Sequence, residues 1–187
     1  MVLWGEDSPL YRRLGFTPLG HQLRVPLSGV VSALDRAPAF LRLEEGFSSD
    51  VFLEMNQRRR KHGGALLSVA EAEELLSYRH TQWARVIDAE GRLAGYGAFG
   101  KGIDLGRQIH EWGGTPEAIR MLARWALSLD PEAEIMGNQP MLEEAFSQLP
   151  AETIVESLCL AKFFDSELEA LLRSREDHLW FWGVDGV

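Results

Sequence analysis

The sequence has too few cysteines and too short apolar runs for several protein classes. Cys159 is the single cysteine, so no disulfide framework can form within the chain, which is typical of a reducing compartment. No run approaches the ~18 apolar residues of a membrane-spanning helix. The first residues have neither the basic start nor the apolar core of a signal peptide. We therefore expect a cytoplasmic protein with no membrane partner.

Basic residues are also scarce. The chain has 19 Lys and Arg against 28 Asp and Glu, and its net charge of -9 would repel nucleic acid phosphates. The one basic cluster, residues 58–61, falls at the end of a predicted helix, where the helix dipole favours cations. The histidines and the cysteine show no metal-ligand spacing, so no metal site is predicted. We expect no nucleic acid partner.

The length and composition of the chain are otherwise typical of a globular protein. The 187 residues, 45% of them hydrophobic, suffice for one core, or for one domain and a piece of another. Residues 1–27 predict a strand, a short helix that begins at Ser8 and ends at Gly15, and a second strand. Such a piece cannot bury its apolar side alone. Residues 28–38 are predicted to be a linker, and a new domain is predicted over 39–187.

The pattern in residues 39–187 predicts an α/β (α+β) domain that opens with one strand and two helices and continues with an antiparallel three-strand meander. A helix follows the meander, with Thr115 as its N-cap and Pro116 as its first residue. The expected strands are 39–44, 83–88, 92–100, 107–112, 134–137, 153–160 and 178–184, and the expected helices are 50–61, 69–78, 116–129, 141–149 and 166–173.

This order of elements resembles the GNAT superfamily of N-acetyltransferases. The resemblance implies a mixed, mostly antiparallel central sheet flanked by helices. A second match is the spacing of Tyr11, Gly15 and Phe16, which is similar to an apolar-Tyr-x-x-x-Gly-Phe segment near the end of a GNAT unit. Residues 1–27 thus resemble the C-terminal remnant of one GNAT unit, followed by a second, degenerate GNAT-like domain over 39–187.

The resemblance implies two catalytic groups. Tyr11 matches the tyrosine that protonates the departing coenzyme A thiolate, a task for which a phenol with a pKa of about 10 is suited. Alternatively, Tyr11 and Phe16 only hold a helix on the sheet. Glu111 matches the carboxylate that deprotonates the amine. Strand alternation places His110 on the opposite face from Glu111.

The resemblance also places cofactor contacts at Gly113, Gly114 and Thr115, where a strand turns into a helix N-terminus that can bind pyrophosphate. The alternative is a tight turn before a well-capped helix. Pro116 and Glu117 favour that alternative, since one lacks an N–H and the other adds negative charge. A glycine-rich run over 95–102 imitates nucleotide-binding loops but suits a hairpin better.

The implied function is acetyl-CoA-dependent acetyl transfer to the amine of a small molecule or peptide. The alternative is a non-catalytic GNAT-like module that binds a partner or forms a homodimer. A third reading, an unrelated α/β fold, predicts no splayed strands near Glu111 and Glu134.

Overall fold

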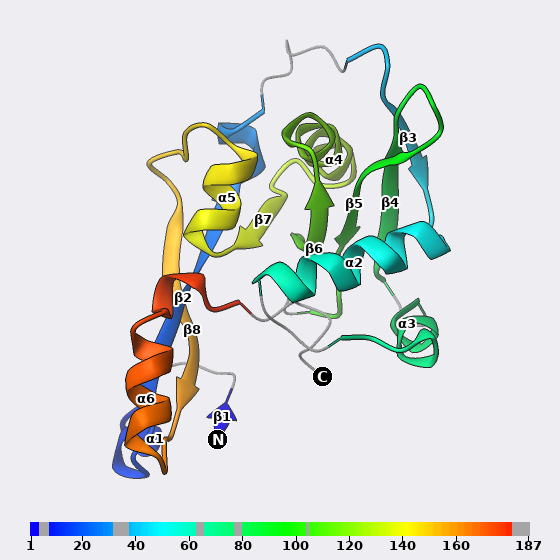
Figure 1. Cartoon of the computed structure of the whole chain (residues 1–187). Coiled ribbons are helices and arrows are strands. Elements are labelled where there is room, and N and C mark those ends of the chain that lie inside the picture. The colour runs from blue at the N-terminus through cyan, green and yellow to red at the C-terminus, as the bar shows by residue number, and fades with distance from the viewer. Residues whose placement is uncertain (4–7, 32–37, 63–65, 77–79, 104, 181–187) are drawn as a thin grey trace.

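The computed structural model describes residues 1–3, 8–31, 38–62, 66–76, 80–103 and 105–180 (Figure 1). The strands are β1 (Val2–Leu3), β2 (Thr17–Pro26), β3 (Arg42–Glu45), β4 (Gln82–Ile87), β5 (Leu93–Phe99), β6 (Gln108–Gly114), β7 (Glu134–Gly137) and β8 (Ile154–Ala161). The helices are α1 (Pro9–Arg13), α2 (Ser49–His62), α3 (Val69–Leu76), α4 (Pro116–Leu129), α5 (Gln139–Ala145) and α6 (Ser166–Arg173), with 3₁₀ turns η1 (Leu27–Gly29) and η2 (Glu176–His178).

These strands form one mixed sheet in the order β1-β8-β2-β7-β6-β5-β4-β3. Among the described strands only β6 and β7 pair in parallel, and their pairing is confined to Gln108 with Glu134 and Ile109 with Ile135. The other neighbours are antiparallel. The predicted α/β class with a mostly antiparallel sheet is confirmed.

The early strand β2 lies in the middle of this sheet. It pairs with β8 from Thr17 to Arg24 and with β7 from Leu23 to Pro26. It therefore separates β7 from β8, and residues 17–26 complete the sheet built by residues 42–161. That residues 1–27 descend from a preceding GNAT unit stays a prediction.

Helices cover both faces of the β4–β6 region. Helix α4 packs on one face through Ile119, Leu122 and Ala126, which its 3.6-residue period places on one side. Helix α2 packs on the other face against β5 and β6 (Figure 1). The main core lies between these layers.

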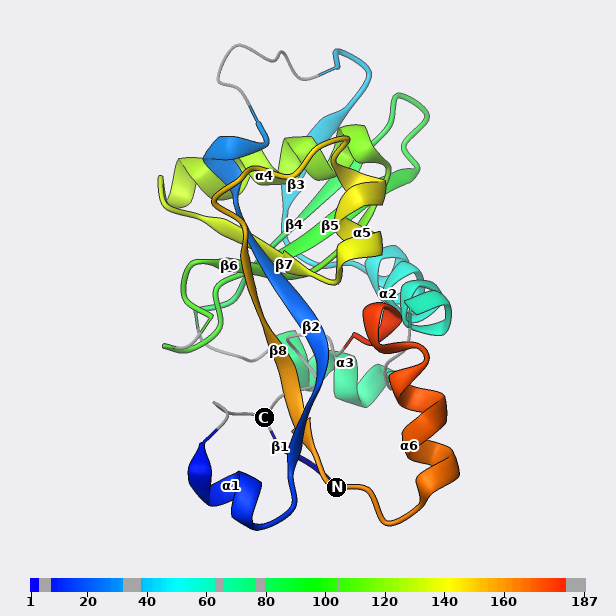
Figure 2. The same cartoon turned by 90° about the vertical axis from the view of Figure 1, so that its left-hand side faces the viewer.

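Strands β2 and β8 continue together beyond the main core (Figure 2). We call this extension the arm: residues 17–22 of β2, residues 157–161 of β8, and the elements β1, α1 and α6 at its end. A small separate cluster of Leu19, Cys159 and Ala161 holds it together. None of the described helices has the length and apolar character needed to cross a membrane.

Most predicted elements are present with small shifts. Strand β7 and helix α6 have the predicted bounds, whereas α5 begins two residues early because Asn138 caps it through the N–H of Met141. The strand expected at 178–184 is not seen in its described part, since His178 belongs to η2 and the next two residues are irregular. The rest of that expected strand lies outside the described residues.

Candidate functional site

Tyr11 lies on α1, at the end of the arm. Ser8 caps this short helix. Phe16, which follows the helix, packs edge-on against the Tyr11 ring, with 6.1 Å between the ring centroids. Phe16 is buried, whereas the Tyr11 side chain is half-buried. The Tyr11 hydroxyl makes no hydrogen bond to another residue in the described part of the chain. The phenol is thus anchored by its ring with its hydroxyl available.

Glu111 lies elsewhere, in the middle of β6, and it is fully buried. Arg59 of α2 donates to its Oε2 at 3.0 Å, and the Tyr96 hydroxyl of β5 donates to its Oε1 at 3.3 Å. Burial and the neighbouring carboxylate hold the pKa of Tyr96 well above its usual value, so the phenol stays a donor. Both Glu111 oxygens are therefore bound to the protein itself.

A β-bulge turns Glu111 toward α2. Ala98 pairs with Glu111 while Phe99 pairs with Ile109, so His110 is an extra residue in β6. Ile109 and Leu122 of α4 both approach Gly97, so Ile109 faces α4, while Glu111 reaches Arg59 on the opposite face. Without the bulge, residues two apart would share a face.

Gly113 and Gly114 follow Glu111, and both are needed for packing. A Cβ at Gly113 would lie 2.8 Å from Nε of Arg58 and 2.8 Å from Cε1 of Tyr96. Gly114 has φ +127°, and a Cβ there would lie 2.3 Å from Cα of Gly95. The same turn accepts a hydrogen bond from Nη2 of Arg58 on the Gly114 carbonyl, at 3.1 Å. The two glycines bring α2, β5 and β6 close together.

Thr115 is the N-cap of α4. Its Oγ1 accepts the N–H of Ala118 at 3.3 Å, its own N–H donates to Ala94 O at 2.9 Å, and Pro116 supplies no N–H. A surface pocket of about 510 Å³ lies beside this turn, lined by residues that include Glu54, Glu144, Arg58 and Lys61. The carboxylates pair with the cations, with Lys61 3.1 Å from Glu144. The N–H groups of Thr115 and Ala118 therefore have partners within the protein, and the pocket contains charges of both signs, which disfavours a bound anion.

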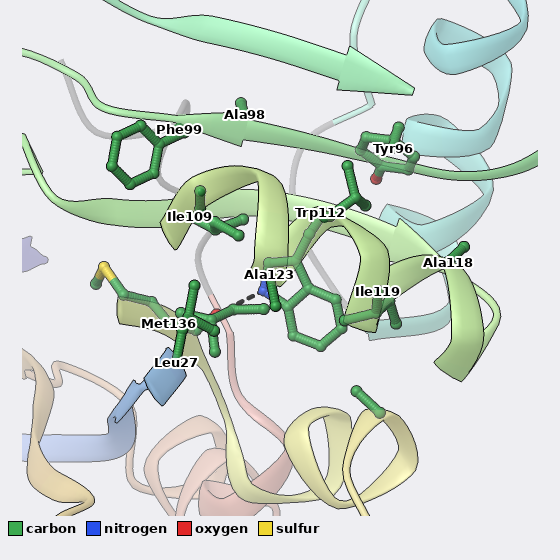
Figure 3. Packing of buried hydrophobic residues seen from close by; sticks show 14 of the residues in the cluster. Leu27, Tyr96, Ala98, Phe99, Ile109, Trp112, Ala118, Ile119, Ala123 and Met136 are labelled. Atoms are coloured by element: carbon green, nitrogen blue, oxygen red, sulfur yellow. Dashed lines mark hydrogen bonds between the residues drawn. The ribbon is translucent and has the colours of Figure 1, made fainter. Parts of the chain in front are cut away.

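The gap between β6 and β7 contains Trp112. The two strands stop pairing after Ile109 and Ile135, so they splay beside Glu111. The Trp112 indole is 1% exposed and donates from Nε1 to the carbonyl of Met136 at 2.7 Å (Figure 3). The splayed strands are thus present, but an indole lies between them.

Three residues of this region were not predicted from sequence. Arg59 was assigned to the helix dipole, Tyr96 to a hairpin face, and Trp112 had no role. A buried arginine is detectable only once its partner is known, because Arg59 and Glu111 are 52 residues apart. Tyr96 and Trp112 do not stand out in the sequence either, because buried aromatic residues are ordinary in protein cores.

Within the described residues no cluster of three or more His, Cys, Asp or Glu could hold a metal ion. His110 and Cys159 are both buried and lie apart from one another, on β6 and β8. Burial raises the pKa of the Cys159 thiol to about 11, which keeps the sulfur protonated and unreactive.

Comparison with known proteins identifies solved structures with a similar fold. No protein-family model and no curated protein matches the sequence. The chain is similar to a conserved protein of unknown function from Enterococcus faecalis V583, named as a probable N-acyltransferase, with a TM-score of 0.53 and 18% identity over 83% of this chain and 43% of that one. It is also similar to a GCN5-related N-acetyltransferase from Kribbella flavida, with a TM-score of 0.50 and 15% identity over 85% of this chain and 42% of that one.

These comparisons confirm the predicted fold, which is similar to that of a GCN5-related N-acetyltransferase. The chain spans less than half the length of either solved structure. The predicted roles of Tyr11, Glu111, Gly113, Gly114 and Thr115 are not tested by this likeness and stay predictions.

Proposed function

We propose that this chain serves the acetyl-CoA-dependent transfer of an acetyl group to an amine as a GNAT-fold unit that supplies Tyr11, while its own residues 39–187 do not perform the transfer. The observation that carries the proposal is the separation of the two expected groups. Tyr11 lies on α1 at the end of the arm, and Glu111 lies on β6, with β2 and β7 between β6 and β8. They do not share one cleft.

The state of each group supports this division. The Glu111 carboxylate is enclosed by Arg59 and Tyr96, so it is poorly placed to take a proton from an incoming amine. The Tyr11 side chain is half-buried and its hydroxyl has no hydrogen bond within the described residues, and a phenol can protonate a departing thiolate. In this proposal Tyr11 acts at a cleft formed by another GNAT unit, and the acceptor is a small-molecule or peptide amine.

Calorimetry of the 187-residue protein with acetyl-CoA tests the first half of the proposal, with desulfo-CoA as the comparison. We expect no binding heat from either ligand and no turnover of an amine panel by the chain alone. Micromolar binding of acetyl-CoA would contradict the proposal, because it would mean that the chain holds a working cofactor cleft.

The role of Tyr11 needs a protein that has a cofactor cleft. A chimera would carry this chain in place of the matching region of the Kribbella flavida N-acetyltransferase. In an active chimera we expect Tyr11→Phe to lower kcat about 10²-fold or more, with little change in KM for acetyl-CoA. Leu10→Ala, which changes an exposed neighbour on the same helix, is the matched control. Equal activity of the two variants would exclude Tyr11 as the proton donor.

A second candidate is a purely non-catalytic module that forms a homodimer. It is favoured by Leu168 and Leu171, which are exposed three residues apart on α6, and by Phe164, which is exposed just before the helix begins. Sedimentation equilibrium distinguishes the candidates. Dimers that dissociate on Leu171→Glu, but not on Leu129→Glu of α4, would favour this second function.

A further inference from the structure

Strand β3 lies at one end of the sheet, and its outer edge pairs with no other strand of the described chain (Figure 1). The Gly46 N–H, just after β3, donates to a carbonyl of β4 at 2.7 Å. Because backbone groups alternate in direction along an antiparallel strand, those of Glu44 and Arg42 also point toward β4. The backbone groups of Leu43 and Glu45 therefore point outward, where another strand can pair with them.

The charges on β3 have both signs. Charged residues on a short edge strand usually protect a protein from edge-to-edge association. Arg42 and Glu44 share one face of β3, and within the chain they already form an ion pair at 2.6 Å. Arg85 of β4 holds the same Glu44 carboxylate at 2.8 Å. The edge thus presents a fixed carboxylate and, two residues away, a guanidinium that can pair with a carboxylate.

A second copy of β3 fits this edge in one register. In two-fold antiparallel pairing one residue faces its own equivalent, and that residue defines the register. Like charges would lie opposite each other if this residue were Arg42, Glu44 or Glu45, which is destabilising. If it is Leu43, Arg42 of each copy lies opposite the partner's Glu44. Among the residues of β3, only Leu43 gives a register with complementary charges.

The same register uses the outward backbone groups. The Leu43 N–H of each copy would donate to the partner's Leu43 carbonyl, and the Glu45 N–H would donate to the partner's Leu41 carbonyl. The Leu41 N–H needs no partner, because it already donates to the Pro38 carbonyl at 3.0 Å. Backbone direction and charge therefore select the same pairing.

The residues that flank β3 also suit this arrangement. Antiparallel pairing brings the start of one strand to the end of the other, so Phe40 of one copy would lie near the partner's Gly46. Phe40 is 59% exposed, and a Cβ built on Gly46 would meet no atom within 4 Å. There is space over the glycine for an aromatic ring.

We infer that two copies of this chain join their sheets edge to edge through β3, with Leu43 at the two-fold axis and Arg42 paired with the partner's Glu44. This surface goes beyond the proposed function and does not depend on it. Strand β3 and strand β1 are at opposite ends of the sheet, so the arm that carries Tyr11 stays outside the dimer (Figure 1).

Sedimentation equilibrium of the wild type from about 10 µM to 1 mM measures the dimer. A short strand buries less area than a standard interface, so we expect a weak dimer that forms in the upper part of this range. Arg42→Glu places like charges opposite each other and should raise Kd about 10-fold or more. The matched control is Arg92→Glu in the β4–β5 turn, which should leave Kd unchanged. Arg92 and Arg42 are 73% and 72% exposed, and each pairs with a nearby carboxylate.

Mixing two variants tests the register itself. In Arg42→Glu alone carboxylates face carboxylates, and in Glu44→Arg alone guanidinium groups face guanidinium groups, so both should associate more weakly than the wild type. In an equal mixture they should form heterodimers, because both contacts then join opposite charges. A variant that is only misfolded is not rescued by mixing. Recovery of the dimer therefore separates strand pairing from a structural effect.

Glu44→Arg can unfold the chain, because Glu44 also pairs with Arg85. Glu45→Pro then replaces it. Proline removes an outward N–H and leaves the pairing of β3 with β4 intact, so this variant should be folded and should dimerise more weakly than the wild type.

The results that would overturn the inference are clear. One is a wild type that stays monomeric at about 1 mM. Another is a dimer that Arg42→Glu leaves as tight as Arg92→Glu does. A dimer that dissociates on Leu171→Glu lies at α6 and also contradicts the β3 interface. The proposed function is tested separately, because acetyl-CoA binding does not depend on any of these results.

Discussion

Glu111 and Arg59 form an ion pair in which both side chains have no exposed surface. Burying two charges is costly, and their attraction offsets this cost only when geometry and further hydrogen bonds are good. Here the Tyr96 hydroxyl adds the further bond to the carboxylate. The pair joins α2 to β6, so we assign Glu111 a structural task within this chain.

Removing the Arg59 side chain should therefore strongly destabilise the folded protein. In Arg59→Met, Glu111 keeps the Tyr96 hydroxyl but loses the guanidinium, and we expect the free energy of unfolding to fall by about 3–5 kcal/mol. In the double variant Arg59→Met with Glu111→Leu, most of this loss should return, because no charge remains buried. Urea unfolding of the two variants and the wild type measures both values. A double variant no more stable than Arg59→Met would contradict this account.

His110, the extra residue of the bulge, makes stability depend on pH. Burial lowers its pKa to about 4, since a charged ring would be desolvated, while the hydrogen bond to Gly100 O opposes this shift and Lys101 adds to it. The unfolded chain takes up a proton near pH 6.5, and the folded chain does so only near pH 4. Between these values the unfolded state binds more protons, so stability falls as the pH falls.

We expect this effect to remove about 3 kcal/mol of wild-type stability between pH 7 and pH 4. His110→Gln retains a donor near the Gly100 carbonyl but has no ionisable group, so its stability should change less over the same range. Lowered carboxyl pKa values at Asp50 and Asp88 affect both proteins alike and cancel in the comparison. Parallel pH profiles for wild type and variant would exclude His110 as the cause.

At the residue scale the sequence identified Glu111 but not its environment. The alternation rule places successive residues on opposite faces, and it does not detect a bulge, which is visible only once β5 is paired with β6. Gly113 and Gly114 were predicted as cofactor contacts because of their position after a strand. Their use in packing depends on Arg58 and Gly95, which come from other elements.

At the scale of elements, the start of α4 is defined by one side chain. Thr115→Ala should lower the free energy of unfolding by about 1 kcal/mol, because the Ala118 N–H loses its acceptor. Thr115→Ser keeps the acceptor and should stay within a few tenths of the wild type. Urea unfolding measures both. If the two variants are equally stable, the cap contributes little.

Elements with strong local signals were predicted well. Ser68 and Glu71 form a capping box at the start of the predicted helix α3, with the Ser68 N–H 2.7 Å from the Glu71 carboxylate. The strand expected at 178–184 has no such cap or turn signal, and its sequence is marked by aromatic residues instead. In its described part, His178 instead ends a 3₁₀ turn that begins at Glu176. Aromatic residues indicate burial more reliably than they indicate a β-strand.

At the scale of the whole molecule, β2 is the element on which the sheet depends. Its Leu23–Pro26 segment pairs with β7 and its Thr17–Arg24 segment with β8. The pattern of residues 1–27 predicts this strand, but as part of a separate piece outside 39–187. The sequence around residue 20 does not show that this strand pairs with one near residue 158, because such pairing depends on the tertiary structure.

A pair of deletions tests this dependence. Removing residues 1–27 should leave a chain that does not fold, because β7 and β8 lose the strand between them. Removing only residues 1–16 takes away β1 and α1 and should leave a folded protein. Circular dichroism and amide exchange measure the outcome, and a peptide of residues 1–30 should restore structure to the larger deletion. A folded 28–187 fragment would show that the sheet can close without β2.

The place of β2 in the sheet also determines when the protein can fold during synthesis. Its apolar residues Leu19, Leu23 and Val25 leave the ribosome long before their partner strand β8, which ends at Ala161. Protein synthesis adds about 5–20 residues per second, so β8 is completed roughly ten seconds after β2. Through that interval the nascent chain presents an unpaired apolar strand, so translation speed and chaperone supply should govern the yield of native protein.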